Sequence, residues 1–481
     1  MQNTIFQHRV FQLDKTRKEP LYLQLYQQIK QDISNGNLSY GQKLPSKRKI
    51  AEDLVISRNT VETAYGQLLA EGYIEAKSRT GFFVSFKAEQ FFIQPSVKLQ
   101  KNKKNKTPKF RYDLNPDQID TALFPFNLWR KQTKILLNQA NRTLLCIGEK
   151  QGETILREQI RQYLYASRGV NCNVDQIIIG AGVETCLSQL ILLFDHLYPQ
   201  KKLNYAMEQH GYPMVERLLH VFQKDVVKLP LLNEKLKIDF QILQQSAVNI
   251  LYVTPSHQYP YGSVLSINER HQLLEWANKA EDRYIIEDDY DSEFRYKGKP
   301  IPALQHLDQH LPHSKVIYLG SFSKLLMPSL RITFMVLPQT LLPVYQRTCG
   351  LFNSTAPRLN QHLIAQFMQS GEFEKHIHKM RTNYRKKMEL LCQLLQPYHQ
   401  SIRYYGEQSS FYLLLDLYQE QRSIEQLRQL AESVSIKLYP IQQSVSDKKY
   451  FSLGFGNLTH DELSQAVSLL MQVWGYSKAA L

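Results

Sequence analysis

Lys324 ends the phrase VIYLGSFSK and lies close to two serines, Ser321 and Ser323. The apolar residues 316–319 predict a short buried strand, and the small residues after them predict a turn. A primary amine held at a strand end can condense with an aldehyde. The two hydroxyls, with the guanidinium of Arg331 in LLMPSLR, suit a phosphate. The combination favours pyridoxal 5'-phosphate (PLP), an aldehyde cofactor that carries a phosphate.

An acidic phrase, RYIIEDDYDSEF, follows the pattern of another strand end. A carboxylate there is what the pyridinium nitrogen of such a cofactor needs. The pattern SxSK alone is also common in surface turns. The acidic strand end is a second, separate feature that a PLP site needs, so it strengthens the cofactor interpretation.

The chain has 481 residues, enough for one large and one small domain with separate cores. Its five cysteines show no CxxC spacing, and no apolar run reaches membrane-spanning length. The first residues contain no secretory segment. These features predict a soluble protein of the reducing cytoplasm, with no membrane partner and no metal site.

Positive charge is concentrated at the front of the chain. The formal net charge is +15, and residues 1–110 contain 19 lysines and arginines against 9 aspartates and glutamates. A basic segment of this kind is the electrostatic signature of a polyanion partner. A solvated basic face is the alternative.

Apolar spacing in residues 21–86 predicts three short helices and a hairpin. The first helix begins at Leu21, the second starts at Ser46, and Ser57 is the expected N-cap of the third. The phrase EGYIEAKSRTGFFVSF then predicts two short strands with a basic tip. This order of elements is typical of a winged helix-turn-helix, whose third helix enters the major groove of DNA. A helical protein-interaction domain is the alternative.

The predicted DNA contacts fall into two groups. Arg58 and Asn59, at the outer start of the third helix, can read base edges. Residues at the second helix and the wing suit phosphates. The full set is Ser46, Lys47, Arg48, Arg58, Asn59, Thr60, Thr63, Lys77, Arg79, Thr80 and Gly81.

Residues 87–110 are rich in Lys, Asn, Gln and Pro and predict a basic linker. They separate a DNA-binding domain of residues 1–86 from a second domain of residues 111–481. In the second domain, strand-like runs alternate with helical segments such as residues 267–280. The runs are residues 177–179, 250–253, 284–286 and 316–319. The pattern predicts an α/β domain with a mainly parallel sheet, helices on both faces, and a ligand site at the carboxyl ends of the strands.

Further candidate cofactor contacts lie in three phrases. In IIIGAGVETCLSQL, Gly182 precedes a helix whose first amides, at Val183 and Glu184, can hold a phosphate. Three residues are expected around the ring: His257 and Tyr259 in TPSHQYPYG, and Tyr212, a stacking surface, in MEQHGYPMVERLL. An ordinary loop histidine and an ordinary core tyrosine are equally good interpretations of His257 and Tyr212.

Two groups of phrases carry a family resemblance. LYLQLYQQIKQDISNG and LPSKRKIAEDLVISRNTVETAYGQLLAEGYIEAKSRTGFFV closely resemble a GntR-type DNA-binding domain. YDLNPDQIDTALFPFNLWRK, EQIRQYLYASRGV, TPSHQYPYG, IIEDDYDSEFRY and GSFSKLLMPSLRITFMVLP resemble the fold-type I PLP-dependent aminotransferases. The chain as a whole resembles the MocR subfamily of GntR regulators, which join these two parts. The resemblance implies a smaller C-terminal α+β subdomain and a homodimer.

The resemblance also implies roles for individual residues. They are Lys324 for the covalent bond to the cofactor, Arg331, Ser321 and Ser323 for its phosphate, Asp288 for its ring nitrogen and Tyr290 for its ring hydroxyl. Asp289 lies next to Asp288, and the sequence does not decide which of the two carboxylates faces the ring nitrogen.

Three departures bear on enzymatic activity. Aminotransferases hold the substrate carboxylate with a late arginine, and Ser452 in YFSLGFGNL stands at that position. Met214 stands where amino-acid-responsive relatives have a second arginine, and YPYG at residues 259–262 replaces Asn-Pro-Thr-Gly. Neutral side chains cannot replace two guanidinium forks, although Arg403 or another basic residue could do so.

The sequence therefore predicts a cytoplasmic transcription regulator, not an enzyme, although residual half-transamination stays possible. It is expected to bind promoter DNA and to sense either PLP itself, as a regulator of PLP synthesis would, or an amine or amino acid. The alternative is a working aminotransferase with an added DNA-binding domain.

Overall fold

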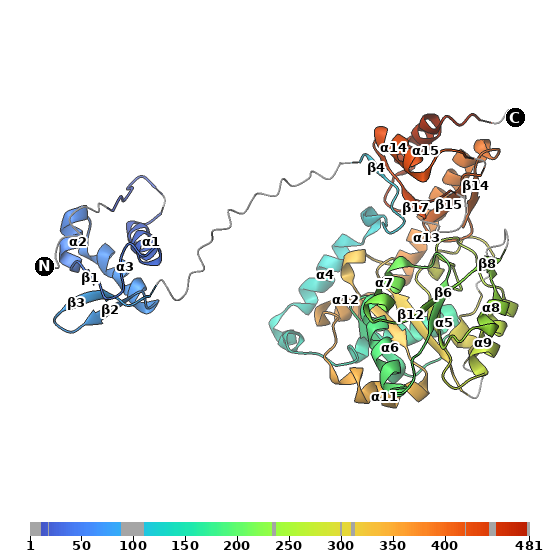
Figure 1. Ribbon diagram of the computed structural model, residues 1–481, viewed down its shortest axis with the longest axis horizontal. Coiled ribbons are helices and arrows are strands. Elements are labelled where there is room, and N and C mark those ends of the chain that lie inside the picture. Colours follow the sequence, from blue (N-terminus) through green and yellow to red (C-terminus); the bar gives the residue numbers. More distant parts are fainter. Residues whose placement is uncertain are drawn as a thin grey trace. The chain divides into compact units, whose positions relative to one another are not determined.

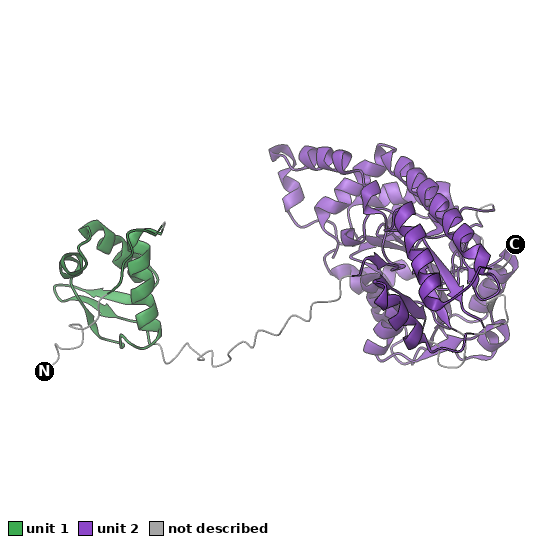
Figure 2. Ribbon diagram, turned by 90° about the horizontal axis from the view of Figure 1, so that it is seen from above, with its two compact units in different colours: residues 1–107 green, residues 108–481 purple. Residues whose placement is uncertain are grey.

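A computed structural model describes residues 11–17, 19–87, 110–232, 237–298, 301–308, 313–418, 420–441 and 449–478. The chain divides into two units, residues 1–107 and residues 108–481 (Figure 2). Apart from Lys87 and Phe110, the linker predicted at residues 87–110 lies outside the described residues. The predicted domain boundaries remain predictions.

The described residues of unit 1 form three helices and a three-stranded antiparallel sheet with the order β1-β3-β2 (Figure 1). The elements are α1 (Leu21–Ser34), β1 (Lys43–Leu44), α2 (Lys47–Leu54), α3 (Arg58–Ala70), β2 (Ile74–Lys77) and β3 (Gly81–Val84). The predicted winged helix-turn-helix is confirmed.

Local sequence explains how these helices begin and pack. The side chain of Ser46 accepts the backbone N–H of Lys49 at 3.2 Å, and that of Ser57 accepts the N–H of Thr60 at 3.1 Å. Both serines are therefore N-caps, as expected for Ser57. The apolar stripes of the helices meet in one core that includes Leu25, Ile29, Val61, Tyr65 and Leu68.

Unit 2 is built on a seven-stranded sheet with the order β5-β13-β12-β11-β10-β6-β7. Neighbouring strands are parallel, except that β13 is antiparallel to both β12 and β5. The strands are β5 (Ile177–Gly180), β6 (Tyr205–Glu208), β7 (Val226–Leu229), β10 (Ile250–Val253), β11 (Tyr284–Asp288), β12 (Val316–Ser321) and β13 (Thr333–Val336). The predicted mainly parallel sheet is confirmed.

Helices cover both faces of this sheet because alternate strand residues point to opposite sides. Ile178 and Leu319 lie in one apolar cluster with α6 (Val183–Leu197), α7 (Pro213–Val221) and α11 (Leu342–Arg347). On the other face, Ile179 packs with α5 (Thr154–Arg168), and Ile285 packs with α9 (Ile267–Asn278) and α10 (Leu304–Asp308).

A smaller subdomain lies at the C-terminal end of unit 2. Its antiparallel sheet has the order β14-β15-β18-β17 and comprises β14 (Arg403–Tyr405), β15 (Tyr412–Asp416), β17 (Tyr439–Ile441) and β18 (Tyr450–Gly454). Its helices are α14 (Ile424–Ser433) and α15 (His460–Trp474), and the long α13 (Glu372–Leu395) packs against α15. The predicted α+β subdomain is confirmed.

Unit 2 contains further helices and short strands. They include β4 (Tyr112–Asp113), α4 (Phe126–Leu136), the 3₁₀ helix η4 (Gln139–Leu145), β8 (Leu231–Leu232), β9 (Lys237–Ile238), α8 (Phe240–Gln245), α12 (Arg358–Gln369) and β16 (Ile436–Lys437). Strand β4 pairs in parallel with β16, so the chain entering unit 2 is attached first to the C-terminal subdomain.

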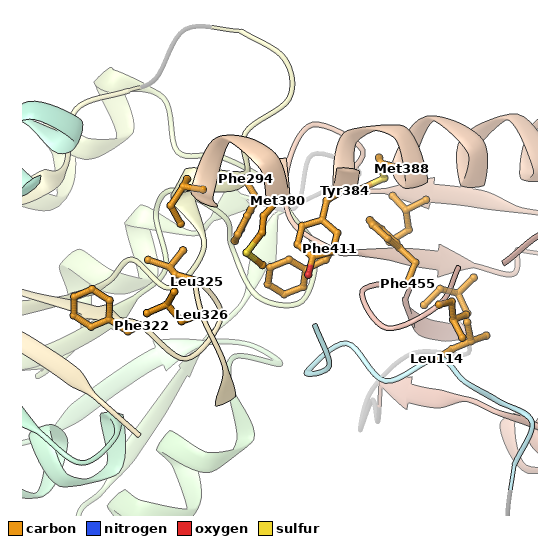
Figure 3. Packing of buried hydrophobic residues seen from close by; sticks show 14 of the residues in the cluster. Leu114, Phe294, Phe322, Leu325, Leu326, Met380, Tyr384, Met388, Phe411 and Phe455 are labelled. Atoms are coloured by element: carbon orange, nitrogen blue, oxygen red, sulfur yellow. The ribbon is translucent and has the colours of Figure 1, made fainter. Parts of the chain in front are cut away.

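One apolar cluster joins the large sheet to the subdomain (Figure 3). Phe322, Leu325 and Leu326, from the turn that carries Lys324, are buried in it. The ring of Phe411, next to β15, packs 5.5 Å from that of Tyr384 on α13. Residues before and after Lys324 are thus packed in the apolar cluster, and this packing fixes the backbone that presents the lysine.

Candidate cofactor site and DNA interface

A cavity of about 290 Å³ lies in unit 2, next to the carboxyl ends of β10, β11 and β12. Ten of the residues predicted to bind the cofactor line it: Lys324, Asp288, Tyr290, Tyr212, Arg331, Ser321, Ser323, Val183, Glu184 and Tyr259. The other two are not part of the lining but adjoin it: Gly182 precedes Val183, and Nδ1 of His257 lies 2.7 Å from the hydroxyl of Tyr290. The structure thus brings the predicted set together in one place.

The amine of Lys324 lies in this cavity. Its Nζ donates hydrogen bonds to the carbonyl oxygen of Pro116 at 3.2 Å and to the carboxylate of Asp117 at 3.0 Å. It also lies 5.2 Å from the centre of the Phe411 ring. The lysine is therefore held by weak, exchangeable contacts from the segment after β4 and from the subdomain.

Arg331 and the start of α6 form one end of the cavity. Arg331 has a left-handed backbone, with φ +52°, and its Nη2 lies 2.7 Å from Oε2 of Glu184. Gly182 is the N-cap of α6 and also has a positive φ, +102°. A Cβ atom at Gly182 would lie 2.2 Å from Nη2 of Arg331, so the guanidinium can lie over the helix start only because this residue is glycine.

Two serines complete this end. The hydroxyl oxygen of Ser321 accepts the backbone N–H of Ser323 at 3.1 Å and the hydroxyl of Thr333 at 3.2 Å. Helix α6 leaves its first backbone N–H groups without partners inside the helix. Hydroxyls, amides and a guanidinium at one end of a cavity form a site for an anion such as a phosphate.

Asp288, rather than Asp289, faces the cavity, because successive strand residues point to opposite sides. Tyr252 donates a hydrogen bond to its carboxylate. Burial, with a smaller effect of nearby carboxylates, raises the pKa of Asp288 to about 7. Asp289 pairs with Arg168, at 2.6 Å between Oδ2 and Nε. Burial opposes the charge of Asp289, but this pair and several hydrogen bonds hold its pKa below the ordinary value.

Tyr290, which lines the cavity, is held in a buried hydrogen-bond network. Its hydroxyl lies 2.7 Å from Nδ1 of His257 and 3.0 Å from the hydroxyl of Tyr412. Nδ1 of His257 also lies 3.1 Å from a carboxylate oxygen of Asp291. His257, expected beside the ring hydroxyl of the cofactor, is instead placed to orient Tyr290.

The structure adds lining residues that the sequence interpretation missed: Pro116, Asp117, Tyr252, Thr254, Pro328, Thr333, Phe411 and Tyr412. Tyr252 and Thr254 could have been found, because they lie at the end of a predicted strand. Phe411 and Tyr412 come from the subdomain and carry no local signal. With Tyr212 and Tyr259, whose rings are 5.7 Å apart, they give the cavity an aromatic part of its wall.

Two of the three departures from the aminotransferase pattern, Ser452 and Met214, lie outside the cavity lining, whereas Tyr259 of the third lines the cavity. Ser452 is buried in the middle of β18, opposite Leu414. Met214 packs against the apolar cluster of α6 and α7. The guanidinium of Arg403 lies 4.5 Å from the ring centre of Tyr418 in the subdomain. Among the described residues that line the cavity, Lys324 and Arg331 are the only lysine and arginine.

In unit 1, the predicted base-reading residues lie at the exposed start of α3. Arg58, Asn59 and Thr63 are exposed, and the hydroxyl of Thr63 donates to the backbone oxygen of Asn59 at 2.9 Å. Thr60 is half-buried and belongs to the N-cap, since its hydroxyl lies 2.8 Å from that of Ser57. Arg58 and Asn59 thus lie outside the core, where their side chains can enter a groove of DNA.

The predicted phosphate contacts flank this surface. Lys47 and Arg48 form ion pairs with Glu62 at 2.6 Å and Glu52 at 2.8 Å, and Lys77 pairs with Glu75 at 3.1 Å. Such partly exposed pairs contribute little to stability and break readily. The remaining members are Ser46 at the cap of α2, and Arg79, Thr80 and Gly81 at the tip of the wing.

Comparison with known proteins identifies both units. Residues 21–84 match the family of bacterial regulatory proteins known as the gntR family. The chain is 38% identical to the uncharacterized HTH-type transcriptional regulator YdeL of Bacillus subtilis, over 96% of this chain and 98% of that protein. It is 31% identical to the probable rhizopine catabolism regulatory protein MocR of Rhizobium meliloti, over 79% and 78% of the two chains. The chain belongs to the MocR subfamily of GntR regulators.

Another relative of this MocR-type regulator is the HTH-type pyridoxine biosynthesis transcriptional regulator PdxR of Corynebacterium glutamicum, 30% identical over 76% of this chain and 77% of that protein. Among solved structures, an archaeal alanine:glyoxylate aminotransferase matches with a TM-score of 0.68 and 20% identity, over 77% of this chain and 92% of that one. The LysN α-aminoadipate aminotransferase of Thermus thermophilus matches with a TM-score of 0.64 and 22% identity, over 76% and 92%.

These findings confirm a DNA-binding transcription regulator that uses the fold of PLP-dependent aminotransferases in a role other than enzymatic catalysis. The working aminotransferase considered as an alternative is not supported. In the described part of the chain, no helix combines the length and the apolar character needed to cross a membrane.

Arg58→Ala and Lys47→Ala are expected to weaken DNA binding in different ways. Loss of Arg58 should cost about 1–3 kcal/mol on the specific site only, because it removes a base contact. Loss of Lys47 should weaken binding to all sequences and make the salt dependence shallower by about one unit. Fluorescence anisotropy at several salt concentrations measures both effects, with Lys375→Ala on α13 as a control. Wild-type binding by both variants would refute this DNA surface.

Proposed function

We propose that this MocR-type regulator binds promoter DNA through its winged helix and senses PLP in the cavity of unit 2. The observation that carries the proposal is the set of residues that line the cavity. The described lining residues include a candidate partner for each polar group of PLP, and Arg331 is the only arginine among them that could bind an amino-acid carboxylate. The cytoplasm is the proposed compartment, because promoter DNA is there.

The residues fit the cofactor at each end. Burial raises the pKa of Asp288 to about 7, so its ionised form is unfavourable without a cationic neighbour. The pyridinium N–H of PLP is such a cation. Arg331, the hydroxyls of Ser321 and Ser323, and the first amides of α6 suit a phosphate. When bound, PLP supplies an aldehyde that condenses with a primary amine, with loss of water.

The other residues of the cavity would orient and enclose the cofactor. Lys324 presents its amine between Pro116, Asp117 and Phe411, all of which it can leave without breaking a buried ion pair. Tyr290 would present its hydroxyl oxygen to the ring hydroxyl, because His257 fixes the orientation of the tyrosine. Tyr212 supplies an aromatic surface.

We further propose that the regulator acts as a homodimer. Large apolar side chains are exposed around η4 and near residue 351, including Leu145 at 80%, Ile147 at 79% and Phe352 at 64%. Apolar side chains gathered on a surface favour a protein interface. A symmetric dimer would present two winged helices to two half-sites of an operator. Sedimentation velocity of the parent and of Ile147→Asp tests this, since the variant should shift toward monomer.

PLP alone is expected to change operator affinity, whereas glutamate, alanine, taurine and GABA should add little. An α-carboxylate would lack the charge-assisted hydrogen bonds of the missing forks, each worth about 1.5–3 kcal/mol, or about ten-fold or more in affinity. The operator is first identified by sequencing genomic DNA captured with the purified protein. The cofactor-free protein is then titrated with PLP against labelled operator, with and without each amino acid. A large response to one amino acid, with equal binding by the cofactor-free and PLP-loaded forms, would favour an amine sensor instead.

A further inference from the structure

Glu184 places a carboxylate at the phosphate end of the cavity. It is the second residue of α6, and its Oε2 lies 2.7 Å from Nη2 of Arg331. A Cβ atom added to Gly182 would lie 2.5 Å from this oxygen and 2.2 Å from the guanidinium nitrogen. The ion pair therefore lies directly over the N-cap of the helix.

This position coincides with the place where the proposed function puts the cofactor phosphate. The same guanidinium and the same helix start would have to receive both anions. Two negative groups that share one cation repel each other, and the repulsion is strongest where water is partly excluded. The side chain of Glu184 must therefore move or remain as an unfavourable neighbour when a phosphate binds.

The pair is weak enough to be displaced. The side chains of Arg331 and Glu184 are 49% and 39% exposed, and pairs with such exposure contribute little to stability. A phosphate monoester, with a charge near −2, can outcompete one carboxylate. It would do so with lower affinity than at a site where the arginine is unpaired.

We propose that Glu184 is an internal competitor for the phosphate group, and that it weakens PLP binding so that the site empties and fills as PLP concentration changes. The inference rests on the proposed function. It assigns the side chain of Glu184 a role opposite to that of its backbone amide, which was expected to hold the phosphate. A sensor needs such reversible occupancy, because a site that is always filled reports nothing.

The test measures ligand affinity instead of transcription. Glu184→Gln keeps the shape of the side chain and removes its charge. Glu216→Gln is the matched control. Glu216 lies in the first turn of the next helix, α7, is 37% exposed and pairs with Lys228 at 2.7 Å. Each cofactor-free protein is titrated with PLP and with pyridoxal, which lacks the phosphate, and its melting temperature is recorded.

Glu184→Gln is expected to bind PLP about ten-fold more tightly, equivalent to about 1.4 kcal/mol, with pyridoxal binding unchanged. Glu216→Gln should leave both affinities unchanged. The PLP concentration that gives the half-maximal operator response should fall by the same factor in Glu184→Gln. If the parent binds PLP and Glu184→Gln binds it equally or more weakly, the competitor role is refuted while the proposed function stands. Absence of PLP binding by the parent and both variants would refute the proposed function, and the competitor role with it.

Discussion

Lys324→Ala is expected to abolish covalent attachment of PLP and the yellow colour of the protein. Alanine has no amine to condense with the aldehyde, so the cofactor would be held only by the contacts to its ring and phosphate. We expect at least about ten-fold weaker binding and complete loss of the visible absorption band. Absorption spectra of the purified variant and the parent measure both effects.

Chemical trapping locates the bond. Borohydride reduction of the parent followed by peptide mapping should place the label on the peptide that contains Lys324. Lys315→Ala, a change immediately before the same strand and outside the cavity lining, should retain the label. A label on any other lysine would refute the assignment of Lys324.

Asp288→Asn is expected to stabilise the cofactor-free protein above neutral pH and to weaken PLP binding. The pKa of Asp288, about 7, lies above its ordinary value of 3.8, so the folded state retains the proton to higher pH than the unfolded state. Stability is therefore lost as pH rises from about 4 to about 7, and the loss persists above 7. Asparagine can still accept the hydrogen bond of Tyr252 but carries no charge. The expected gain at pH 8 is up to about 4 kcal/mol, with little change at pH 4.

Asp289→Asn is the matched control with the opposite sign. It leaves the guanidinium of Arg168 buried without its charged partner, which costs about 3–5 kcal/mol in comparable pairs. Urea unfolding followed by tryptophan fluorescence reports on unit 2, because Trp129, Trp276 and Trp474 all lie there. Destabilisation by Asp288→Asn at pH 8 would contradict the raised pKa.

Patterns that act over a few residues were predictable from the sequence. Ser57 caps α3 as expected, and β10 covers the same residues, 250–253, as the predicted run. Strands β6, β7 and β13 were missed. Residues 322–332 connect β12 to the antiparallel β13, and within them Arg331 has a left-handed backbone that no local pattern signals.

The site itself was only partly predictable. Lys324, Arg331 and the two serines lie in one phrase, so their proximity follows from the chain. The choice between Asp288 and Asp289 depends on Arg168, more than a hundred residues away, which provides a buried cation for Asp289 and leaves Asp288 to the cavity. The place of Asp117 beside Lys324 depends in the same way on a distant segment.

The cavity wall is divided between two bodies. Phe411 and Tyr412 belong to the C-terminal subdomain, whereas Lys324 and Tyr290, which they contact, belong to the large sheet region. A molecule that contacts both parts holds them together, because separating the subdomain from the sheet would break its contacts with one of the two. The binding energy of such a molecule would add to the contacts of the apolar cluster that already joins the two parts.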